Sequence, residues 1–337
     1  MYDGATPEKI HEEVYAAAKE NVPAPLYDRL TDQSNKYRGA AANNTMAFYN
    51  QLPFYVVKPL YTGLAYLLYK CGISLTMSTI WPSVFSYFFA GLLLFYWIQK
   101  YWPPAFAFLA AMLVMLSAPL LGICKLSTPD AMSGLILFAA IFFLIERQSL
   151  LWGTIFLLLA ILTRLDNVIP ATFLLIATKF SQSTHQLFPN KKLLLLVGLV
   201  LLTGFCVSLA SRSFGWNIFY YPTFMKQLNS GYEMHGSFEL KDYVALAKSQ
   251  LMTGLFFSSI CIFLLLILFL FTGLRSFSFS ALSVEQIFAM AFVLIMISRF
   301  LLQPLIADRI YIPYYLSLVV FLVRKYSFSM NGIIDRR

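Results

Sequence analysis

The chain has 337 residues, of which 59% are hydrophobic and only 12% are charged, with a net charge of +9 and a mean hydropathy of +0.69. An ordinary soluble domain carries about 25% charged residues, so this composition excludes a soluble globular protein. It indicates a polytopic membrane protein, whose apolar surface is solvated by lipid. The positive charges are spread over loop ends and not clustered on one face, which excludes a nucleic-acid-binding protein.

Residues 1–51 differ from the rest of the chain. They hold seven acidic and five basic residues and no apolar run. Thr6 suits the N-cap and Pro7 the first position of a helix, which we expect to run to about Glu20. The next stretch, 52–70, is aromatic and amphipathic, with Lys58 and Pro59 in it. This pattern predicts a helix lying in the membrane interface, not a spanning one.

Apolar segments near the roughly 20 residues needed to cross a bilayer follow. They predict eight or nine transmembrane helices, at about 77–98, 104–123, 130–146, 150–163, 167–180, 193–210, 251–273, 285–303 and 309–323. The short segments 150–163 and 167–180 are divided by Arg164 and Asp166. They are either one broken span or two spans, and only two spans keep the loop charges alternating between the sides of the membrane.

The charge distribution predicts the orientation of the chain. The C-terminus carries Arg324, Lys325, Arg336 and Arg337, and Lys191 and Lys192 fall on the same side of an alternating bundle. The positive-inside rule therefore places the C-terminus in the cytoplasm and the loops 1–51 and 211–250 outside. No apolar segment precedes the external residues 1–51, so we expect a preceding transmembrane helix to be missing from this sequence.

Two parts follow from this organisation. Residues 1–76 form an external loop with juxtamembrane helices, and residues 77–337 form a transmembrane bundle with an external loop at 211–250. The predicted fold is thus all-α, a polytopic helical bundle whose first external loop carries short interfacial helices.

Charged residues in or beside spans are informative, because each costs about 2.5–3.5 kcal/mol at a helix centre. Five such sites fall on the external side of the predicted topology: Tyr2–Gly4 with Asp3, Lys125–Asp130, Thr163–Asn167 with Arg164 and Asp166, Arg299, and Ala307–Pro313 with Asp308, Arg309 and Tyr311. Arginine binds phosphate oxygens in a bidentate manner, and a nearby carboxylate can take a proton from a hydroxyl. Together these sites suit a lipid-linked phosphate and an acceptor.

Structural roles compete with that interpretation. Asp3 could be a solvated terminal residue, and Asp130 could be a helix N-cap or first-turn acid. Arg164 and Asp166 could form a structural salt bridge, and Asp308 with Arg309 could anchor a helix at the interface.

The sequence assigns no metal site and no cofactor. The four cysteines (Cys71, Cys124, Cys206 and Cys261) are widely spaced in or beside apolar segments, and the three histidines (His11, His185 and His235) are scattered in loops. These spacings match no zinc pattern, and no nucleotide-binding or metalloprotease motif is present. A divalent cation is the cofactor that this leaves open.

Taken in order, these segments resemble the GT-C superfamily of membrane glycosyltransferases, of the protein-mannosyltransferase and aminoarabinose-transferase type. The resemblance covers almost the whole chain. It is carried by the acid in Tyr2–Gly4 followed by IHEEVYAAAKE, by QLPFYVVKPLYTGLAYLLYKCGIS, by KLSTPDAMSGLILF, by LAILTRLDNVIP and by DRIYIPYY.

The resemblance implies roles for single residues. Asp3 would be the catalytic base or a substrate-orienting carboxylate, and Asp130 would be the second such acid. Arg164 and Arg309 would hold the carrier phosphate, with Lys125 as a further candidate. The substrate-binding set is completed by Asp166, Arg299 and Tyr311.

The implied function is transfer of a sugar from a polyprenyl-phosphate carrier to an acceptor glycan, lipid or protein at the external face of a bacterial cytoplasmic (inner) membrane. Its partners would be membrane lipids and the lipid-linked sugar donor. Two other classes remain open: a transporter or flippase of a lipid-linked or anionic solute, and a scaffold subunit of a membrane complex. A transporter predicts charges near the bilayer midplane and two similar halves, whereas these charges gather at one face, with Arg299 as the nearest exception.

Overall fold

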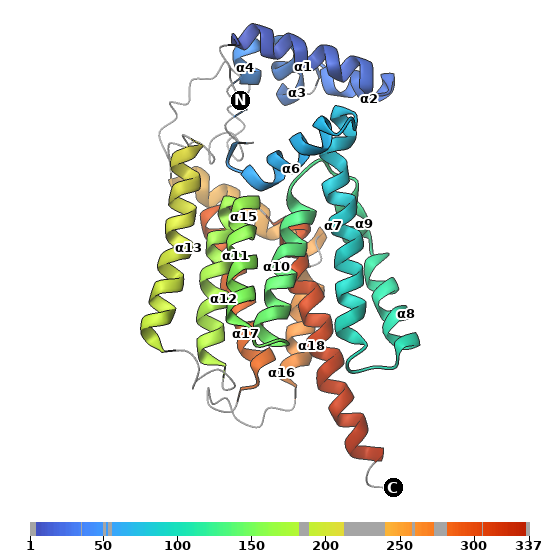
Figure 1. Ribbon diagram of the computed structural model, residues 1–337, viewed down its shortest axis with the longest axis vertical. Helices are drawn as coiled ribbons and strands as arrows, with labels where there is room; N and C mark the ends of the chain where they lie inside the picture. The colour runs from blue at the N-terminus through green and yellow to red at the C-terminus, as the bar shows by residue number, and fades with distance from the viewer. Residues whose placement is uncertain are drawn as a thin grey trace.

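The computed structural model describes residues 5–34, 36–49, 52, 56–181, 189–211, 240–257, 260–272, 282–304 and 306–334. Every regular element among these residues is a helix, which confirms the predicted all-α class. The N-terminal helices lie together at one end of the molecule and the C-terminus lies at the other (Figure 1).

The first four helices form a small layer at the N-terminal end (Figure 1). They are α1 (Pro7–Asn21), α2 (Ala24–Thr31), α3 (Lys36–Asn43) and α4 (Thr45–Tyr49). The predicted start of α1 is confirmed, because Thr6 caps the helix by accepting a hydrogen bond from the Lys9 amide. Rings of His11, Tyr15 and Phe48 pack together with centroids 4.7–5.7 Å apart and join α1 to α4.

Helix α6 (Pro59–Lys70) connects this layer to the bundle. Its 12 residues are too few to cross a bilayer, so the predicted non-spanning helix is confirmed. It packs against α7 (Leu75–Ile98) and α11 (Leu150–Thr163). Tyr66 and Tyr69 on its other face are exposed, as expected for aromatic residues at a membrane interface.

The bundle proper is built around α10 (Asp130–Ile145). Besides α7 and α11 it contains α8 (Pro104–Met115), α9 (Ala118–Cys124), α12 (Val168–Phe180), α13 (Asn190–Ala210), α15 (Leu240–Phe257), α16 (Ile260–Phe271), α17 (Val284–Leu302) and α18 (Asp308–Ile334). Helix α10 packs on α7, α11 and α18, while α12 packs on α13 and α17. Large rings fill the core between them, namely Trp97, Phe138, Phe292, Tyr314 and Phe321.

Two outer helices present apolar side chains to the surroundings. Phe106 and Leu113 on α8 and Leu194 and Phe205 on α13 are each at least 60% exposed. Such a surface is unfavourable in water but suits the hydrocarbon of a bilayer. The composition argument for a membrane protein therefore has a counterpart in the structure.

Three of the described helices are long and apolar enough to cross a membrane: α7, α13 and α17. A fourth candidate is the pair α8 and α9, taken as one span with a bend of 71°. Helices α10 and α11 and residues 262–271 are apolar but shorter. The structure thus supports a helical membrane protein with three or four candidate spans, and the count of eight or nine stays a prediction.

Three expected helix boundaries are corrected. The segment 104–123 is not continuous: it breaks after Met115, because Pro119 cannot continue the preceding helix, and the Tyr87 hydroxyl donates to the freed Met115 carbonyl at 2.6 Å. The helix expected to begin at 251 begins earlier, because α15 starts at Leu240, inside the expected loop 211–250. Helix α18 continues past 323 to Ile334, because a helix that leaves the bundle does not require apolar residues.

The segments 150–163 and 167–180 form two separate helices, α11 and α12, joined by the 3₁₀ turn η1 (Leu165–Asn167). This agrees with the choice of two segments over one broken segment. Gly153 lets α11 approach α10 closely, because a Cβ atom there would lie 2.3 Å from Leu144 Cδ2.

A polar cluster lies at the C-terminal end of α10. Glu146, which caps α10, accepts hydrogen bonds from Trp97 Nε1 at 3.1 Å, Lys100 Nζ at 2.8 Å and the Tyr101 hydroxyl at 2.6 Å. Three donors of this kind satisfy the carboxylate at the end of an otherwise apolar helix. The cluster lies at the opposite end of α10 from Asp130, so the two ends of this helix carry separate ionic sites.

Candidate functional site

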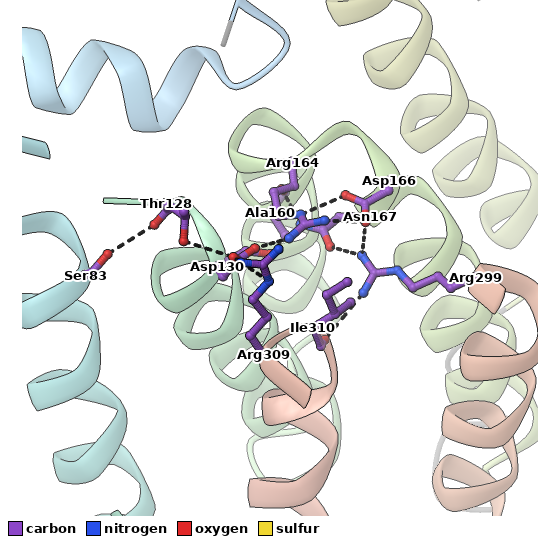
Figure 2. A network of polar contacts seen from close by, with 11 residues as sticks. Ser83, Thr128, Asp130, Ala160, Arg164, Asp166, Asn167, Arg299, Arg309 and Ile310 are labelled. Atoms are coloured by element: carbon purple, nitrogen blue, oxygen red, sulfur yellow. Dashed lines mark hydrogen bonds and ion pairs between the residues drawn. The ribbon is translucent and has the colours of Figure 1, made fainter. Parts of the chain in front are cut away.

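Five charged side chains form one ion-pair network at the N-terminal end of α10. In order they are Arg309, Asp130, Arg164, Asp166 and Arg299, so that cations and carboxylates alternate. Figure 2 shows the side chains converging from α10, the α11–α12 turn, α17 and α18. Four of the five external sites predicted from sequence therefore include residues that the fold brings to the same end of the bundle.

Asp130 is the buried centre of this network, with a side chain only 4% exposed. It is the first residue of α10 but makes no capping hydrogen bond, so the N-cap role is wrong, although Asp130 is a first-turn acid. One oxygen, Oδ1, pairs with Arg164 Nη1, and the other, Oδ2, lies 3.3 Å from Arg309 Nε. The Thr128 hydroxyl donates to Oδ2 at 2.9 Å.

A serine on the neighbouring helix α7 supports this carboxylate. Ser83 is fully buried and its hydroxyl donates to the carbonyls of Leu126 at 2.7 Å and Thr128 at 3.1 Å. The loop before α10 is thereby fixed to α7, and the Thr128 side chain is turned toward Asp130 (Figure 2).

The turn between α11 and α12 supplies a bidentate pair. Arg164 ends α11 in an extended conformation, and its Nε and Nη2 each lie 3.0 Å from an oxygen of Asp166. Burial alone would raise the pKa of Asp166, but the positive charges of Arg164 and Arg299 outweigh burial and hold the pKa well below its usual range. Asp166 is therefore a permanent anion between two arginines.

Arg299 closes the network from α17. Its side chain is 7% exposed, and its Nη2 donates to Asp166 Oδ2 at 2.9 Å and to Asn167 Oδ1 at 2.8 Å. The Asn167 amide is fully buried and donates in turn to Ser133 Oγ at 2.8 Å and to the Ala160 carbonyl at 2.7 Å.

Arg309 is the open member of the network. Its side chain is 43% exposed, against 18% or less for the other two arginines. Its Nε lies 3.3 Å from Asp130 Oδ2, and Arg309 makes no hydrogen bond or ion pair with any other residue that the structure describes. A guanidinium held at one side in this way presents a fork of N–H donors.

Other charged residues lie close by. The pKa of Lys58, which precedes α6, is lowered mainly by burial and further by Arg164 and Arg309, while Asp130 and Asp166 raise it. Tyr311 on α18 is 2% exposed and interacts electrostatically with Arg299, Asp166 and Asp308.

Two predicted site residues that the structure describes, Lys125 and Tyr311, are not members of the ion-pair network. Lys125 is exposed at the end of α9, and its side chain has no hydrogen bond or ion pair with the residues that the structure describes. Asp3 lies outside the described residues.

Several residues of the site were not predicted as such. Asn167, Thr128, Ser133, Ser83 and Lys58 have no distinctive motif, although all lie in or near apolar segments where polar side chains need partners. That need for a partner is the signal by which Asn167 and Ser133 could have been found. Ser83 could not, because nothing in the sequence indicates that α7 packs beside residues 126–128.

The chemistry that the network can perform follows from its charge. It contains three arginines and two carboxylates, and Lys58 and Asp308 nearby add one charge of each sign. Among the residues that the structure describes, these groups leave one positive charge in excess, and Arg309 is the most exposed of the three arginines. Within the described part of the chain, no cluster of three or more His, Cys, Asp or Glu residues could hold a metal ion. The geometry suits binding of an anion.

Comparisons with known proteins return no match. No protein family, no curated protein and no solved structure matches this chain. The functional interpretation therefore depends on the ion-pair network and on the apolar helices that carry it.

Proposed function

We propose that this protein is a membrane glycosyltransferase that moves a sugar from a polyprenyl-phosphate carrier to an acceptor at the network end of the bundle. The observation that carries the proposal is the open fork of Arg309, anchored on buried Asp130 and supported by two further arginines. Arginine is the side chain best suited to planar, bidentate binding of phosphate oxygens. The bacterial cytoplasmic membrane, with the network on its external side, is the expected location.

Access from the membrane supports a lipid carrier over a soluble phosphate. Helix α6 packs on α7 and α11, whose ends carry residues of the site, and it exposes Tyr66 and Tyr69. Aromatic residues of this kind favour the level of lipid headgroups. A phosphate bound at Arg309 would lie near that level, with its isoprenoid chain in the hydrocarbon.

The proposed transfer is a displacement at the anomeric carbon of the sugar. The acceptor oxygen forms a bond to that carbon, the bond from the carbon to the phosphate oxygen breaks, and the phosphate leaves with the electron pair. Arg309 would stabilise the charge that develops on the departing phosphate. The proton of the acceptor hydroxyl passes to a carboxylate acting as general base.

The two candidate acids would divide the work. Both oxygens of Asp130 are engaged by Arg164, Arg309 and Thr128, so Asp130 is better suited to orient the arginines than to accept a proton. The general base would then be Asp3. A divalent cation bound together with the donor phosphate is compatible with this scheme and is not required by it.

Binding of the carrier tests the proposal most directly. Purified protein in detergent micelles is titrated with a radiolabelled polyprenyl phosphate, and polyprenol of the same length serves as the phosphate-free ligand. Arg309→Ala should weaken phosphate binding by on the order of 10- to 100-fold, the loss expected for a hydrogen bond to a charged group. Arg147→Ala is the matched control, because Arg147 lies at the other end of the bundle and donates to the Tyr96 hydroxyl.

A second assay separates transfer from transport. In proteoliposomes loaded with acceptor extract and a panel of polyprenyl-phosphate sugars, a transferase releases polyprenyl phosphate and forms a glycosylated product. Movement of intact carrier across the membrane without cleavage would instead establish the flippase.

In the binding assay, equal binding of polyprenyl phosphate by Arg309→Ala and wild-type protein would disprove the phosphate site.

A further inference from the structure

Arg299 connects the residues that follow the other two arginines. Its Nη2 donates to Asp166 and Asn167, two and three residues after Arg164. Its Nη1 lies 3.5 Å from the carbonyl of Ile310, the residue after Arg309. A single planar guanidinium thus spans the space between the side chains of Asp166 and Asn167 in η1 and the backbone of the first turn of α18 (Figure 2).

Asn167 fixes the inner side of this bridge. Its side chain is fully buried, its two N–H groups donate to Ser133 on α10 and to Ala160 on α11, and its oxygen accepts from Arg299. All three hydrogen bonds are 2.8 Å or shorter. Buried networks that are satisfied in this way rigidify the elements that they join, so the position of Arg299 is set by α10 and α11.

Arg299 itself is poorly placed to touch a ligand. Its side chain is 7% exposed, and its Nε is buried without a hydrogen-bond partner among the described residues. A buried, unpaired donor is costly. The contacts of the terminal nitrogens with Asp166, Asn167 and Ile310 set the plane of the guanidinium, and in that plane Nε has no described partner.

We infer that Arg299 and Asn167 are positioning residues that set the separation between Arg164 and Arg309. This inference rests on the proposed phosphate site. It adds that Arg299 and Asn167 hold that site in place and that Arg299 does not touch the ligand. Helix α17 ends at Leu302 and α18 begins at Asp308, and the Arg299 bridge ties the first turn of α18 to α17 and η1, in addition to the Arg309–Asp130 pair that joins α18 to α10. Loss of the bridge would let Arg309 drift without removing its charge.

A double-mutant cycle tests this role. Arg299→Lys keeps the charge but loses the planar fork, so one ammonium cannot hold Asp166, Asn167 and Ile310 in the same geometry. We expect Arg299→Lys to weaken binding of radiolabelled polyprenyl phosphate by on the order of tenfold, part of the loss for Arg309→Ala. In the Arg309→Ala background, Arg299→Lys should have little further effect, less than about twofold, because the group that it positions is absent.

A matched control separates positioning from general destabilisation. Arg324→Lys makes the same chemical change in an arginine of α18 that is paired at 2.7 Å with Glu285, in the first turn of α17 and at the other end of that helix from Arg299. It should leave phosphate binding unchanged, with all variants checked for a folded state by size exclusion and thermal unfolding. If Arg299→Lys does not fold, Asn167→Ser, which retains a shorter hydrogen-bonding side chain, replaces it in the same cycle.

The outcomes are distinguishable. Non-additive losses for Arg299→Lys and Arg309→Ala support the inference. Additive losses overturn it and leave the phosphate site standing, because Arg309 would still be required. Unchanged binding in Arg309→Ala overturns the proposed site and, with it, any positioning role of Arg299.

Discussion

Asp166→Asn is the sharpest test of the energetics of the network. The carboxylate lies between two arginines, with oxygens 3.0 Å from Arg164 Nε, 3.0 Å from Arg164 Nη2 and 2.9 Å from Arg299 Nη2. The amide keeps the shape of the side chain but removes its charge and turns an NH₂ group toward a guanidinium. The Asp166 side chain is itself 24% exposed, but its partner Arg299 is only 7% exposed, and removing the partner of a buried charge typically costs about 3–5 kcal/mol.

Thermal unfolding in detergent micelles measures this loss. For a chain of this size about 2 °C of melting temperature is expected per kcal/mol, so the midpoint should fall by about 6–10 °C. Asp28→Asn on the exposed face of α2 is the matched control, with an expected change within about 0.5 kcal/mol. A midpoint for Asp166→Asn that equals that of Asp28→Asn would refute the view that this carboxylate holds the arginines together.

Two further outcomes follow from buried polar groups. Tyr314→Phe should raise the free energy of unfolding by about 1 kcal/mol, since the Tyr314 hydroxyl is buried without a partner among the described residues. Tyr87→Phe should lower the free energy of unfolding by about 1 kcal/mol, since the substitution removes the hydrogen bond to the Met115 carbonyl. Glu146 accepts hydrogen bonds from Trp97, Lys100 and Tyr101, and Lys100 also forms an ion pair with it. Glu146→Gln should therefore lower the melting temperature at pH 7, because a neutral amide accepts weaker hydrogen bonds than a carboxylate, and a midpoint equal to that of the wild-type protein would contradict the assignment.

The parts of the fold that were predictable from sequence are those that depend on local signals. The start of α1 at Pro7, the short α6 and the turn at Arg164–Asp166 follow from caps, prolines and charges in otherwise apolar runs. The failures lie where tertiary contacts decide. The break after Met115 is stabilised by a tyrosine from α7, and the early start of α15 at Leu240 has no apolar signal.

The site shows the same division. Charge placement alone brought out Asp130, Arg164, Arg299 and Arg309, because an ionisable residue beside an apolar helix is expensive and needs a reason. The order of pairing was not predictable, since it depends on which helix ends meet. The sequence assigned the carrier phosphate to Arg164 and Arg309 alike and Arg299 to the wider substrate-binding set, whereas in the structure the side chain of Arg309 is 43% exposed, that of Arg164 18% and that of Arg299 7%.

The different exposure of the three arginines indicates that the network serves a function at a cost in stability. A purely structural cluster would pair every cation with a carboxylate, yet among the described residues one positive charge is in excess and a buried Arg299 nitrogen lacks a hydrogen-bond partner. Local violations of this kind are expected at functional sites, where the remainder of the fold compensates for them. An anion bound at Arg309 would supply the missing negative charge, so the bound state would be more stable than the free protein by an amount set by ligand concentration and affinity. The surplus charge is thus better explained by a ligand than by folding, which is why the proposal assigns the opening at Arg309, and not the buried ion pairs, to the phosphate.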